Sequence, residues 1–436
     1  MNVPPLRLTN HLRALLAQGG ASTALHLQRA TGKSQPSVSL ALAKLGPEVH
    51  KMGAARSTRY ALTQPILGLD AAQAVHLDGP HTDQGQFGTL VLLRGNLVHV
   101  RGPRNSEWLT DGALPWWLSP LRPQGFIGRQ FARLRPDFPS DPDQWTLAQV
   151  LYMAANHLPD PPGAFAIGLQ KPAPRTTATH TDRGATFDRL ADAAADSLPA
   201  GSSAGGEQPK FVGRVGDAQV IVKFSPPRGT PFGERWHDLL QLEHLAGQIL
   251  RGQGIAVAQT ELVYTQRRTY LQSSRFDRVG AAGKRHVVAA SALHDAFADA
   301  PRRHWVATCE ALSARKLLAS EHVRTVASVY LFGQYIGNTD MHFGNLSFFV
   351  DDVTKPVLVP APVYDMLPMV WRPGIHGGEL ESTPIRAQAQ PAGFEAQAAQ
   401  ARLWAITFWQ RAARLPTLGS ASREASAQSA RNLQHA

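Results

Sequence analysis

The feature that most restricts the fold of this chain is a polar loop enclosed by apolar segments in its C-terminal third. The sequence YIGNTDMHFGNLSFF spans residues 335–349, and PAPVYDMLPM spans residues 360–369. Asp340 and Asn345 lie five positions apart, the strand pattern SFFV follows, and Asp365 comes after a second apolar approach. Together, the five-residue spacing, the strand pattern and the apolar approach to Asp365 make a coincidental arrangement improbable.

This spacing is typical of phosphoryl transfer. In protein kinases an Asp orients the nucleophilic hydroxyl and accepts its proton, while an Asn five positions later and an Asp after a strand hold magnesium. Magnesium needs only a few hard oxygen ligands, since water and phosphate complete its shell. We therefore interpret Asp340 as the catalytic base, and Asn345 and Asp365 as magnesium ligands. Taken singly, each residue is equally compatible with a turn.

An upstream segment supplies what a nucleotide phosphate requires. The loop SSAGGEQPKF, residues 202–211, precedes a β-branched run, VIVKF, that contains Lys223. Gly205 and Gly206 permit close backbone approach, and a strand lysine holds a positive charge rigidly. Glu243 lies in the helical pattern WHDLLQLEHLAGQIL and is expected to pair with Lys223. Alone, such a Gly-Gly pair usually marks a turn and such a lysine is usually solvated.

Positive charge is concentrated at the N-terminus. Residues 1–63 hold eight Lys and Arg against one acid, which is +7, whereas residues 64–436 hold 36 against 32, which is +4. Together they give the net charge of +11. The first segment is therefore the one expected to bind a polyanion.

The same basic segment predicts three short helices and a hairpin. Leucines at helical spacing end at Gly19-Gly20, a second helix contains LHLQRA, and a third runs from Ser34 to Leu45. The sequence VHKMGAARSTRYAL alternates around a glycine turn and resembles the wing of a winged helix. We interpret residues 1–66 as a winged helix-turn-helix domain that binds DNA.

The predicted DNA contacts lie on the polar face of the third helix, on the turn before it, and near the hairpin tip. A plain α+β module with solvated arginines is the alternative interpretation. The residues assigned to DNA are Lys33, Ser34, Gln35, Ser37, Ser39, Lys44, Arg56 and Arg59.

Shifts in composition divide the remaining chain. A Gly, Asp and His rich stretch predicts a linker at residues 67–84, and a second polar stretch, KPAPRTTATHTDRG, predicts a boundary near residue 185. We expect a β-rich subdomain at 85–185, a kinase small lobe with the glycine loop and the ATP lysine at 186–290, and a helical C-lobe at 291–436.

Composition bounds the location of the protein. No apolar run is long enough for a membrane span, and the N-terminus lacks the core and cleavage site of an export signal, so we expect a cytoplasmic protein with no membrane partner. The single cysteine, Cys309, cannot form an internal disulfide and is expected to be a small buried residue.

At these motifs the sequence resembles the HipA family of serine/threonine kinases, known as toxins of bacterial toxin–antitoxin systems. The resemblance covers roughly residues 85–430 through LRPQGFIGR, SSAGGEQPK, VIVKF, SRFDR, IGNTDMHFGN and APVYDM. The most similar type is the YjjJ-like branch, which fuses an N-terminal winged helix to the kinase. The resemblance implies an α+β multidomain protein with a bilobal kinase fold and a mostly helical C-lobe.

The resemblance also implies roles for single residues, with ATP and Mg²⁺ as cofactors. Lys223 would contact the ATP phosphates, residues 274–276 would line the adenine hinge, and His342 would assist at the phosphates. Ser202, with Ser203 next, best matches the loop serine that family members autophosphorylate, where phosphate would add repulsive charge beside ATP. The implied ATP-binding residues are Ser202, Ser203, Gly205, Gly206, Lys223, Ser274, Arg275, Phe276 and His342.

The chain departs from the family pattern in ways that bear on its partners. It has neither an HRD triplet nor a DFG, and its glycine loop differs in length from shorter family loops. HipA relies on a separate DNA-binding antitoxin, whereas this chain would carry its own DNA reader. A protein substrate and DNA are the partners implied, and both a separate antitoxin and self-association stay open.

Three functions are compatible with these residues. The first is an ATP-dependent serine/threonine kinase toxin that regulates its own operon through DNA. The second is a DNA-binding transcription regulator whose kinase fold senses nucleotide without transferring phosphate. The third is a Mg²⁺-dependent nuclease that acts on DNA through the same carboxylates. The strand lysine and the glycine loop favour ATP.

Overall fold

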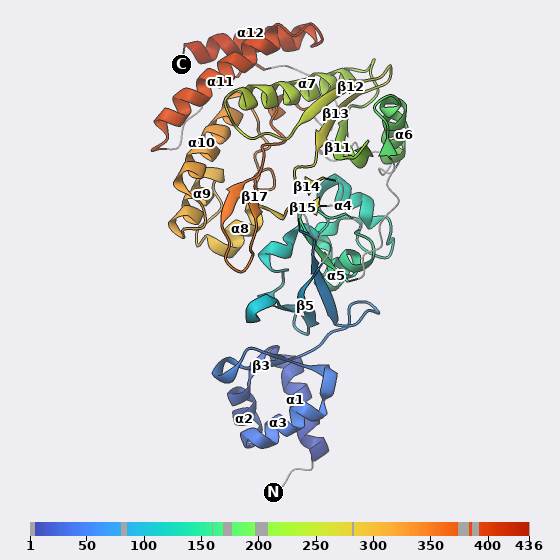
Figure 1. The fold of residues 1–436 in the computed structure, drawn as a ribbon, viewed down its shortest axis with the longest axis vertical. Helices are drawn as coiled ribbons and strands as arrows, with labels where there is room; N and C mark the ends of the chain where they lie inside the picture. The colour runs from blue at the N-terminus through green and yellow to red at the C-terminus, as the bar shows by residue number, and fades with distance from the viewer. Residues whose placement is uncertain are drawn as a thin grey trace.

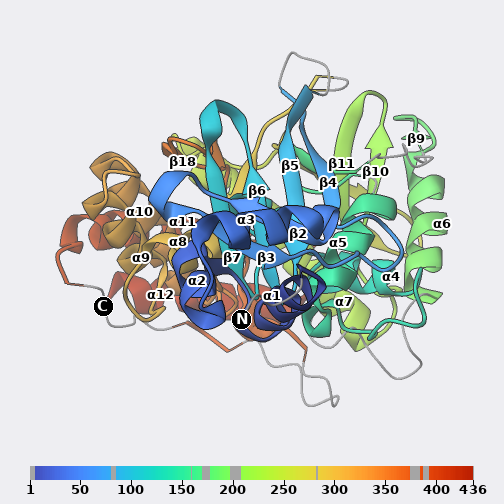
Figure 2. The ribbon, with the colours of Figure 1, turned by 90° about the horizontal axis from the view of Figure 1, so that it is seen from below.

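The computed structural model describes residues 5–79, 85–158, 160–168, 177–196, 208–280, 283–373, 383–385 and 392–435. A small N-terminal module lies at one end of the molecule, and the remaining elements form a larger body (Figure 1). Seen from the N-terminal end, the first three helices lie in front of the larger body (Figure 2).

The N-terminal module contains three helices and a small antiparallel sheet. The helices are α1 (Pro5–Gly19), α2 (Ala24–Thr31) and α3 (Gln35–Lys44), and the sheet has the order β1 (Ser22–Thr23), β3 (Arg59–Leu62), β2 (Val49–Met52). Leu12, Leu16 and Leu27 are fully buried between the helices. Gly32 ends α2 with a φ of 65°, a conformation that glycine adopts without strain. The predicted helices and hairpin are present.

The middle of the chain forms a five-stranded antiparallel sheet. Its order is β7 (Glu107–Asp111), β6 (Leu97–Arg101), β5 (Gly85–Leu93), β4 (Ala72–Leu77), β8 (Phe165–Ile167). The helices α4 (Gly125–Ala132) and α5 (Leu147–Asn156) and the fully buried Trp117 belong to the same region. Strands β5 and β6 form a hairpin whose turn includes Gly95 (φ 79°) and Asn96 (φ 63°).

The prediction of a linker at residues 67–84 is wrong for residues 72–77. These residues form β4, an interior strand that pairs with β5 on one side and with β8 on the other. The sequence of β4, AQAVHL, shows little apolar alternation, and only Val75 is fully buried in the structure. Its second partner arrives from residues 165–167, a pairing that no local pattern reveals.

The next lobe has its own five-stranded sheet with two helices. The sheet has the order β12 (Thr260–Tyr264), β13 (Thr269–Ser274), β11 (Ala218–Phe224), β10 (Lys210–Val215), β9 (Thr177–Ala178), and the helices are α6 (Arg183–Asp196) and α7 (Pro231–Gly252). Strand β9 runs parallel to β10, and α6 begins at Arg183. The predicted boundary at residue 185 therefore comes too late, because a two-residue strand carries no recognisable pattern.

The last lobe is mostly helical, as expected. Its helices are α8 (Ala290–Phe297), α9 (Trp305–Ala314), α10 (Ser320–Tyr335), α11 (Glu395–Ala413) and α12 (Ser420–Gln434), and its small sheet is β16 (Val287–Ala289), β17 (Ser347–Val350), β18 (Leu358–Pro360). Because β16 pairs with β17, the boundary predicted at residue 290 also comes too late. The short hairpin of β14 (Arg278–Val279) and β15 (Gly283–Lys284) lies just before this lobe.

One buried apolar cluster runs through the middle sheet, helix α7 and the helical lobe, from Ile66 to Leu433. Helices α11 and α12 lie next to α7 (Figure 1), so the C-terminal helices pack on the long helix of the preceding lobe. Cys309 is buried in this cluster, as predicted. Among the described residues, no helix combines the length and the apolar character that a membrane crossing requires.

Candidate active site

Lys223 and Glu243 form the buried ion pair that the sequence predicts. Lys223 lies on β11 and Glu243 on α7, which packs against the sheet. The Lys223 Nζ is 2.6 Å from Glu243 Oε1 and 2.8 Å from Oε2, and the two side chains are 9% and 7% exposed. Burial lowers the pKa of the Lys223 ammonium, and the Glu243 carboxylate opposes that shift.

Asp365 contacts the same ammonium through its Oδ1. The segment before it is held in place because Val363 exchanges backbone hydrogen bonds with Ala256 and Ala258, at 2.9 and 3.0 Å. Asp365 itself has a φ of 54°, in the left-handed region that residues other than glycine seldom adopt. Such backbone strain is concentrated at functional sites. A carboxylate is thus held beside Lys223 by a conformation that costs free energy.

The loop after α10 joins the three predicted catalytic residues through their backbones. The Asn338 side chain accepts a hydrogen bond from the Asp340 amide at 3.1 Å and donates one to the Asp365 carbonyl at 3.1 Å. The Asn345 Nδ2 donates to the Asp340 carbonyl at 2.8 Å, which leaves its amide oxygen to act as an acceptor or metal ligand. Asp340, Asn345 and Asp365 are therefore held in one constellation.

Two positioning residues in this region were missed from the sequence. Asn338 is the bridge between the Asp340 loop and the Asp365 loop, and its position two residues before Asp340 is the local signal that could have identified it. Tyr364 donates its hydroxyl to the Gly344 carbonyl at 2.7 Å and lies 2.7 Å from the Ser347 hydroxyl. Burial raises the pKa of Tyr364 to about 12, so it stays a donor at neutral pH.

A cavity of about 470 Å³ opens beside Asp340. His342 is exposed at this loop and its Nδ1 accepts a hydrogen bond from the Gly344 amide at 3.0 Å. A cavity of this size admits a protein side chain next to the Asp340 carboxylate. Its lining consists of Tyr330, Gln334, Gly337, Asn338, Thr339, Asp340, Met341 and His342.

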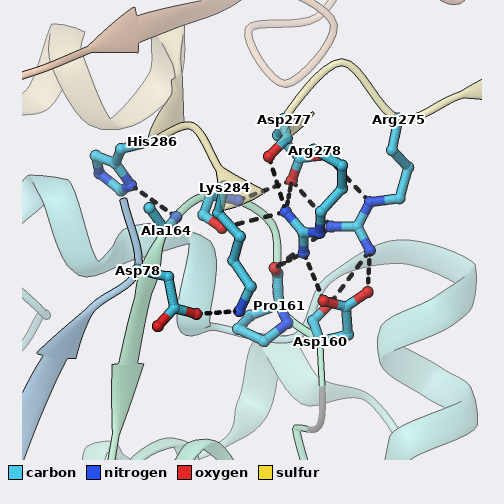
Figure 3. Close-up of polar contacts among 10 residues, drawn as sticks. Asp78, Asp160, Pro161, Ala164, Arg275, Asp277, Arg278, Lys284 and His286 are labelled. Atoms are coloured by element: carbon cyan, nitrogen blue, oxygen red, sulfur yellow. Dashed lines mark hydrogen bonds and ion pairs between the residues drawn. The ribbon is translucent and has the colours of Figure 1, made fainter. Parts of the chain in front are cut away.

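The three residues assigned to the adenine hinge have different surroundings. Ser274 ends β13, and its amide donates to the Gln259 carbonyl at 2.8 Å. The Phe276 ring lies 5.7 Å from that of Tyr364. The Arg275 side chain is only 5% exposed and pairs with Asp160 and Asp277 (Figure 3), so its guanidinium does not line a nucleotide pocket. The buried ion pairs therefore leave only the backbone of Arg275 for the predicted hinge, because the acidic partner Asp160 comes from far away in the sequence.

The glycine-rich loop residues Ser202, Ser203, Gly205 and Gly206 lie outside the described residues. The described chain resumes at Gln208 and enters β10 at Lys210, which is directly opposite Lys223 in the register of β10 and β11. The loop therefore leads into the strand next to the buried lysine.

If magnesium binds at this site, Asn345 and Asp365 are the residues that would hold it. Asn345 and Asp365 offer an amide oxygen and a carboxylate, the hard donors that magnesium takes alongside water and phosphate. Across the described ranges, no three His, Cys, Asp or Glu side chains form a group that could hold a metal alone.

The residues assigned to DNA lie mostly at the surface of the N-terminal module. Lys33 is half-buried, the side chain of Arg56 lies outside the described residues, and the Ser34 and Ser37 hydroxyls are 3.0 Å apart. The hairpin of β2 and β3 is tied to the middle sheet, because the Gly53 amide donates to Glu107 Oε2 at 2.9 Å. The exposed members of the set are Ser34, Gln35, Ser37, Ser39, Lys44 and Arg59.

Comparisons with known proteins match nearly the whole chain. Residues 202–433 match the family model described as HipA-like C-terminal domain, and residues 73–173 match the YjjJ-like toxin, middle domain. Toxin YjjJ of Escherichia coli strain K12 is 34% identical over 433 residues, which cover 95% of each protein.

One solved structure shows a likeness of fold, and a second aligns only in part. A chain from the Shewanella oneidensis MR-1 toxin–antitoxin complex of HipA, HipB and operator DNA aligns with a TM-score of 0.52 at 17% identity, covering 83% of this chain and 96% of that one. The Helicobacter pylori proinflammatory kinase CtkA aligns with a TM-score of 0.37 at 14% identity, covering 55% and 94%.

Proposed function

This chain belongs to the HipA-like family and to its YjjJ-like toxin branch, and on that premise we propose that it is an ATP- and Mg²⁺-dependent serine/threonine protein kinase. Its role is that of a cytoplasmic toxin that phosphorylates a protein. The observation that carries this proposal is the Lys223 ammonium, which is buried against Glu243 and contacted by Asp365. A buried lysine beside two acids, in reach of the Asp340 loop, is the arrangement that phosphoryl transfer needs.

Each residue then has a role that follows from its position. Bound Mg²⁺–ATP would supply the transferable phosphoryl group and a divalent charge that offsets the phosphate oxygens. Lys223 offers its ammonium to phosphate oxygens, and Glu243 keeps that ammonium directed into the site. Asn345 and Asp365 would hold the metal. Asp340, at the cavity, accepts the proton of the substrate hydroxyl, while Asn338 keeps the Asp340 and Asp365 loops together.

Incubation with terminally labelled ATP and Mg²⁺ tests this function directly. We expect label on the protein itself or on added cell proteins, located by mass spectrometry. Asp340→Asn should reduce labelling at least ~100-fold, since a positioned base contributes about 10²–10⁴, and Asp365→Asn should do likewise through loss of the metal. Asp217→Asn, on a fully exposed turn, is the matched control and should label normally.

The competing functions predict different results in the same experiment. Wild-type protein that binds ATP but transfers no label would contradict the kinase and favour a nucleotide-sensing regulator. Cleavage of added DNA that Asp365→Asn abolishes would favour the Mg²⁺-dependent nuclease.

We further propose that the N-terminal module is a winged helix-turn-helix that binds DNA. The concentration of +7 on residues 1–63 and the exposed polar face of α3 support it. In the full-length protein, Lys44→Gln and Arg59→Gln should each weaken DNA binding and lower its salt dependence by about one counterion. Arg13→Gln is the control, because Arg13 is already paired with Glu48 at 2.9 Å. Equal losses in all three variants would contradict a defined DNA face.

A further inference from the structure

Successive side chains of the segment after β13 point alternately to the middle domain and to the helical lobe. Phe276 points to the helical lobe, where its ring lies 5.9 Å from Phe349 and 5.7 Å from Tyr364. Arg275 and Asp277 are buried in a charged cluster that includes residues of the middle domain (Figure 3). Such alternation is what an extended chain imposes on successive side chains. The segment is therefore held from both sides.

The charged cluster contains two arginines and two aspartates. The Asp160 carboxylate, from the middle domain, lies 2.6 Å from Arg275 Nη1 and 2.7 Å from Arg278 Nη2. Asp277 lies 2.9 Å from Arg275 Nη2 and 2.7 Å from Arg278 Nη1. All four side chains are 9% exposed or less. Because the charges balance and the guanidinium forks are shared, removal of one member leaves a buried charge without its partner.

The backbone of the middle domain completes the cluster. Arg278 donates to the Pro161 carbonyl at 2.7 Å and to the Gly163 carbonyl at 3.2 Å, and the Gly163 amide donates to Asp277 at 2.9 Å. Gly163 has a φ of 78°, and a Cβ there would lie 2.7 Å from His286 Nδ1. The loop from Asp160 to Gly163 thus has a shape that only a glycine at position 163 allows without displacement of His286.

We propose that Asp160 is a positioning residue for the nucleotide. Through Arg275 and Arg278 it holds the extended segment whose backbone at residues 274–276 would face the adenine base. This inference rests on the proposed nucleotide-binding function. The middle domain is then a part of the nucleotide site.

On its other side, the 274–278 segment contacts residues next to the proposed metal ligands Asn345 and Asp365. Phe276 packs on Tyr364, and Tyr364 bonds to Gly344 and contacts Ser347 on either side of Asn345. Tyr364 also directly precedes Asp365 in the chain. Displacement of the 274–278 segment would therefore disturb both the binding of the adenine ring and the positions of Asn345 and Asp365.

The test compares two aspartates of the middle domain. Asp160→Asn removes a charge that holds the 274–278 segment. Asp78→Asn is the matched control. Asp78 pairs at 2.6 Å with Lys284, which lies near the charged cluster but outside the 274–278 segment (Figure 3). Binding of ATP and of GTP, each with Mg²⁺, is measured on full-length protein by titration calorimetry, and thermal melting shows which variants are folded at the assay temperature.

We expect Asp160→Asn to raise the Kd for ATP about tenfold or more and to reduce the preference for ATP over GTP. Asp78→Asn should change neither quantity by more than about twofold, even if both variants lose stability. A loss of base preference separates positioning from general destabilisation, because the latter would weaken both nucleotides equally. If Asp160→Asn does not fold, Arg278→Lys keeps the charge but loses the fork, and the same shift in base preference is expected.

The outcomes separate this inference from the function on which it rests. Wild-type protein that binds neither nucleotide would overturn the proposed function. Wild-type protein that binds ATP, with unchanged affinity and base preference in Asp160→Asn or Arg278→Lys, would overturn only the role of Asp160. Equal effects of Asp160→Asn and Asp78→Asn would also overturn it.

Discussion

Two joints hold the middle sheet in the molecule, and their chemistry differs. Toward the kinase lobes the joint is the cluster of Asp160, Arg275, Asp277 and Arg278, in which every charge has an opposite charge within 3 Å. Toward the N-terminal module the polar centre is a pair of histidines, with His50 Nε2 2.9 Å from His99 Nδ1. A small apolar cluster also joins the two parts, with Met52 and Ala61 from the N-terminal module and Val91 and Leu93 from the middle sheet.

This difference determines which joint is weakened at acid pH. Burial opposes ionisation of Asp277, yet Arg275 and Arg278 keep its pKa below the ordinary value, so the charged joint persists well into the acid range. The histidine joint needs one ring to donate and the other to accept, and it is lost when both rings are protonated. The charged joint therefore keeps its ion pairs in mild acid, whereas the histidine joint weakens as the pH falls below neutral.

Removal of a charge from the kinase-side joint should have the largest effect. Asp160→Ala leaves Arg275 and Arg278 buried with one carboxylate between them, and we expect a loss of about 3–5 kcal/mol in the free energy of unfolding. Urea denaturation followed by intrinsic tryptophan fluorescence measures it. The fully exposed Asp217→Ala should show no measurable change. A loss as small as that of the control would mean that the cluster is not a joint.

A methyl group at Gly163 should have the next largest effect. Gly163→Ala forces a left-handed residue and brings its Cβ to 2.7 Å from His286 Nδ1, so we expect about 1–3 kcal/mol of destabilisation. Gly254→Ala is the control for backbone strain alone, since Gly254 has a φ of 77° and no atom within 4 Å of the added Cβ. If the two variants unfold at the same urea concentration, the contact between the added Cβ and His286 has no effect on stability beyond backbone strain.

Acid should weaken the N-terminal joint selectively. Burial, then the charges of His99 and Arg101, lower the pKa of His50 to about 4, and Glu107 opposes the shift only in part. The unfolded chain takes up this proton near pH 6.5 and the folded chain near pH 4, so the free energy of unfolding falls as the pH drops between these values.

The expected loss at the N-terminal joint is about 1 kcal/mol, since His50 is partly solvated. Proteolysis between the N-terminal module and the middle sheet, followed from pH 7 to pH 4.5, measures opening of this joint. His50→Gln should remove most of the pH dependence. Cleavage that rises equally in wild type and in this variant would assign the effect to another group.

An exposed contact between the middle domain and the helical lobe should matter least. Arg104 pairs with Asp352 at 2.9 Å, but the side chains are 66% and 40% exposed. Because solvent screens such pairs, Arg104→Ala should cost less than about 1 kcal/mol, and salt should reduce even that. If Arg104→Ala lowered the melting temperature more at high salt than at low salt, the contact would contribute to the joint between the middle domain and the helical lobe by more than screened charge attraction.

The spacings that define the candidate site are local, whereas the fold around it depends on distant residues. Asp340, Asn345 and Asp365 were singled out by their spacing, and the predicted pairing of Lys223 with Glu243 is present in the structure. Strand β4 was missed because its burial depends on β8, which arrives about ninety residues later. The ion pair of the Arg275 side chain was not predicted, because its partner Asp160 is also remote in sequence.

The amino-acid sequence alone determined the charge of the N-terminal module, its three helices and hairpin, and the residue types of the loop that contains Asp340 and Asn345. These depend on composition, on periodicity and on short spacings, all of which act between near neighbours in the chain. Only the tertiary structure decided where the domains meet and which charges are paired across them. The cost of burying a charge is offset by whichever opposite charge the fold brings close, and residue order does not specify that partner.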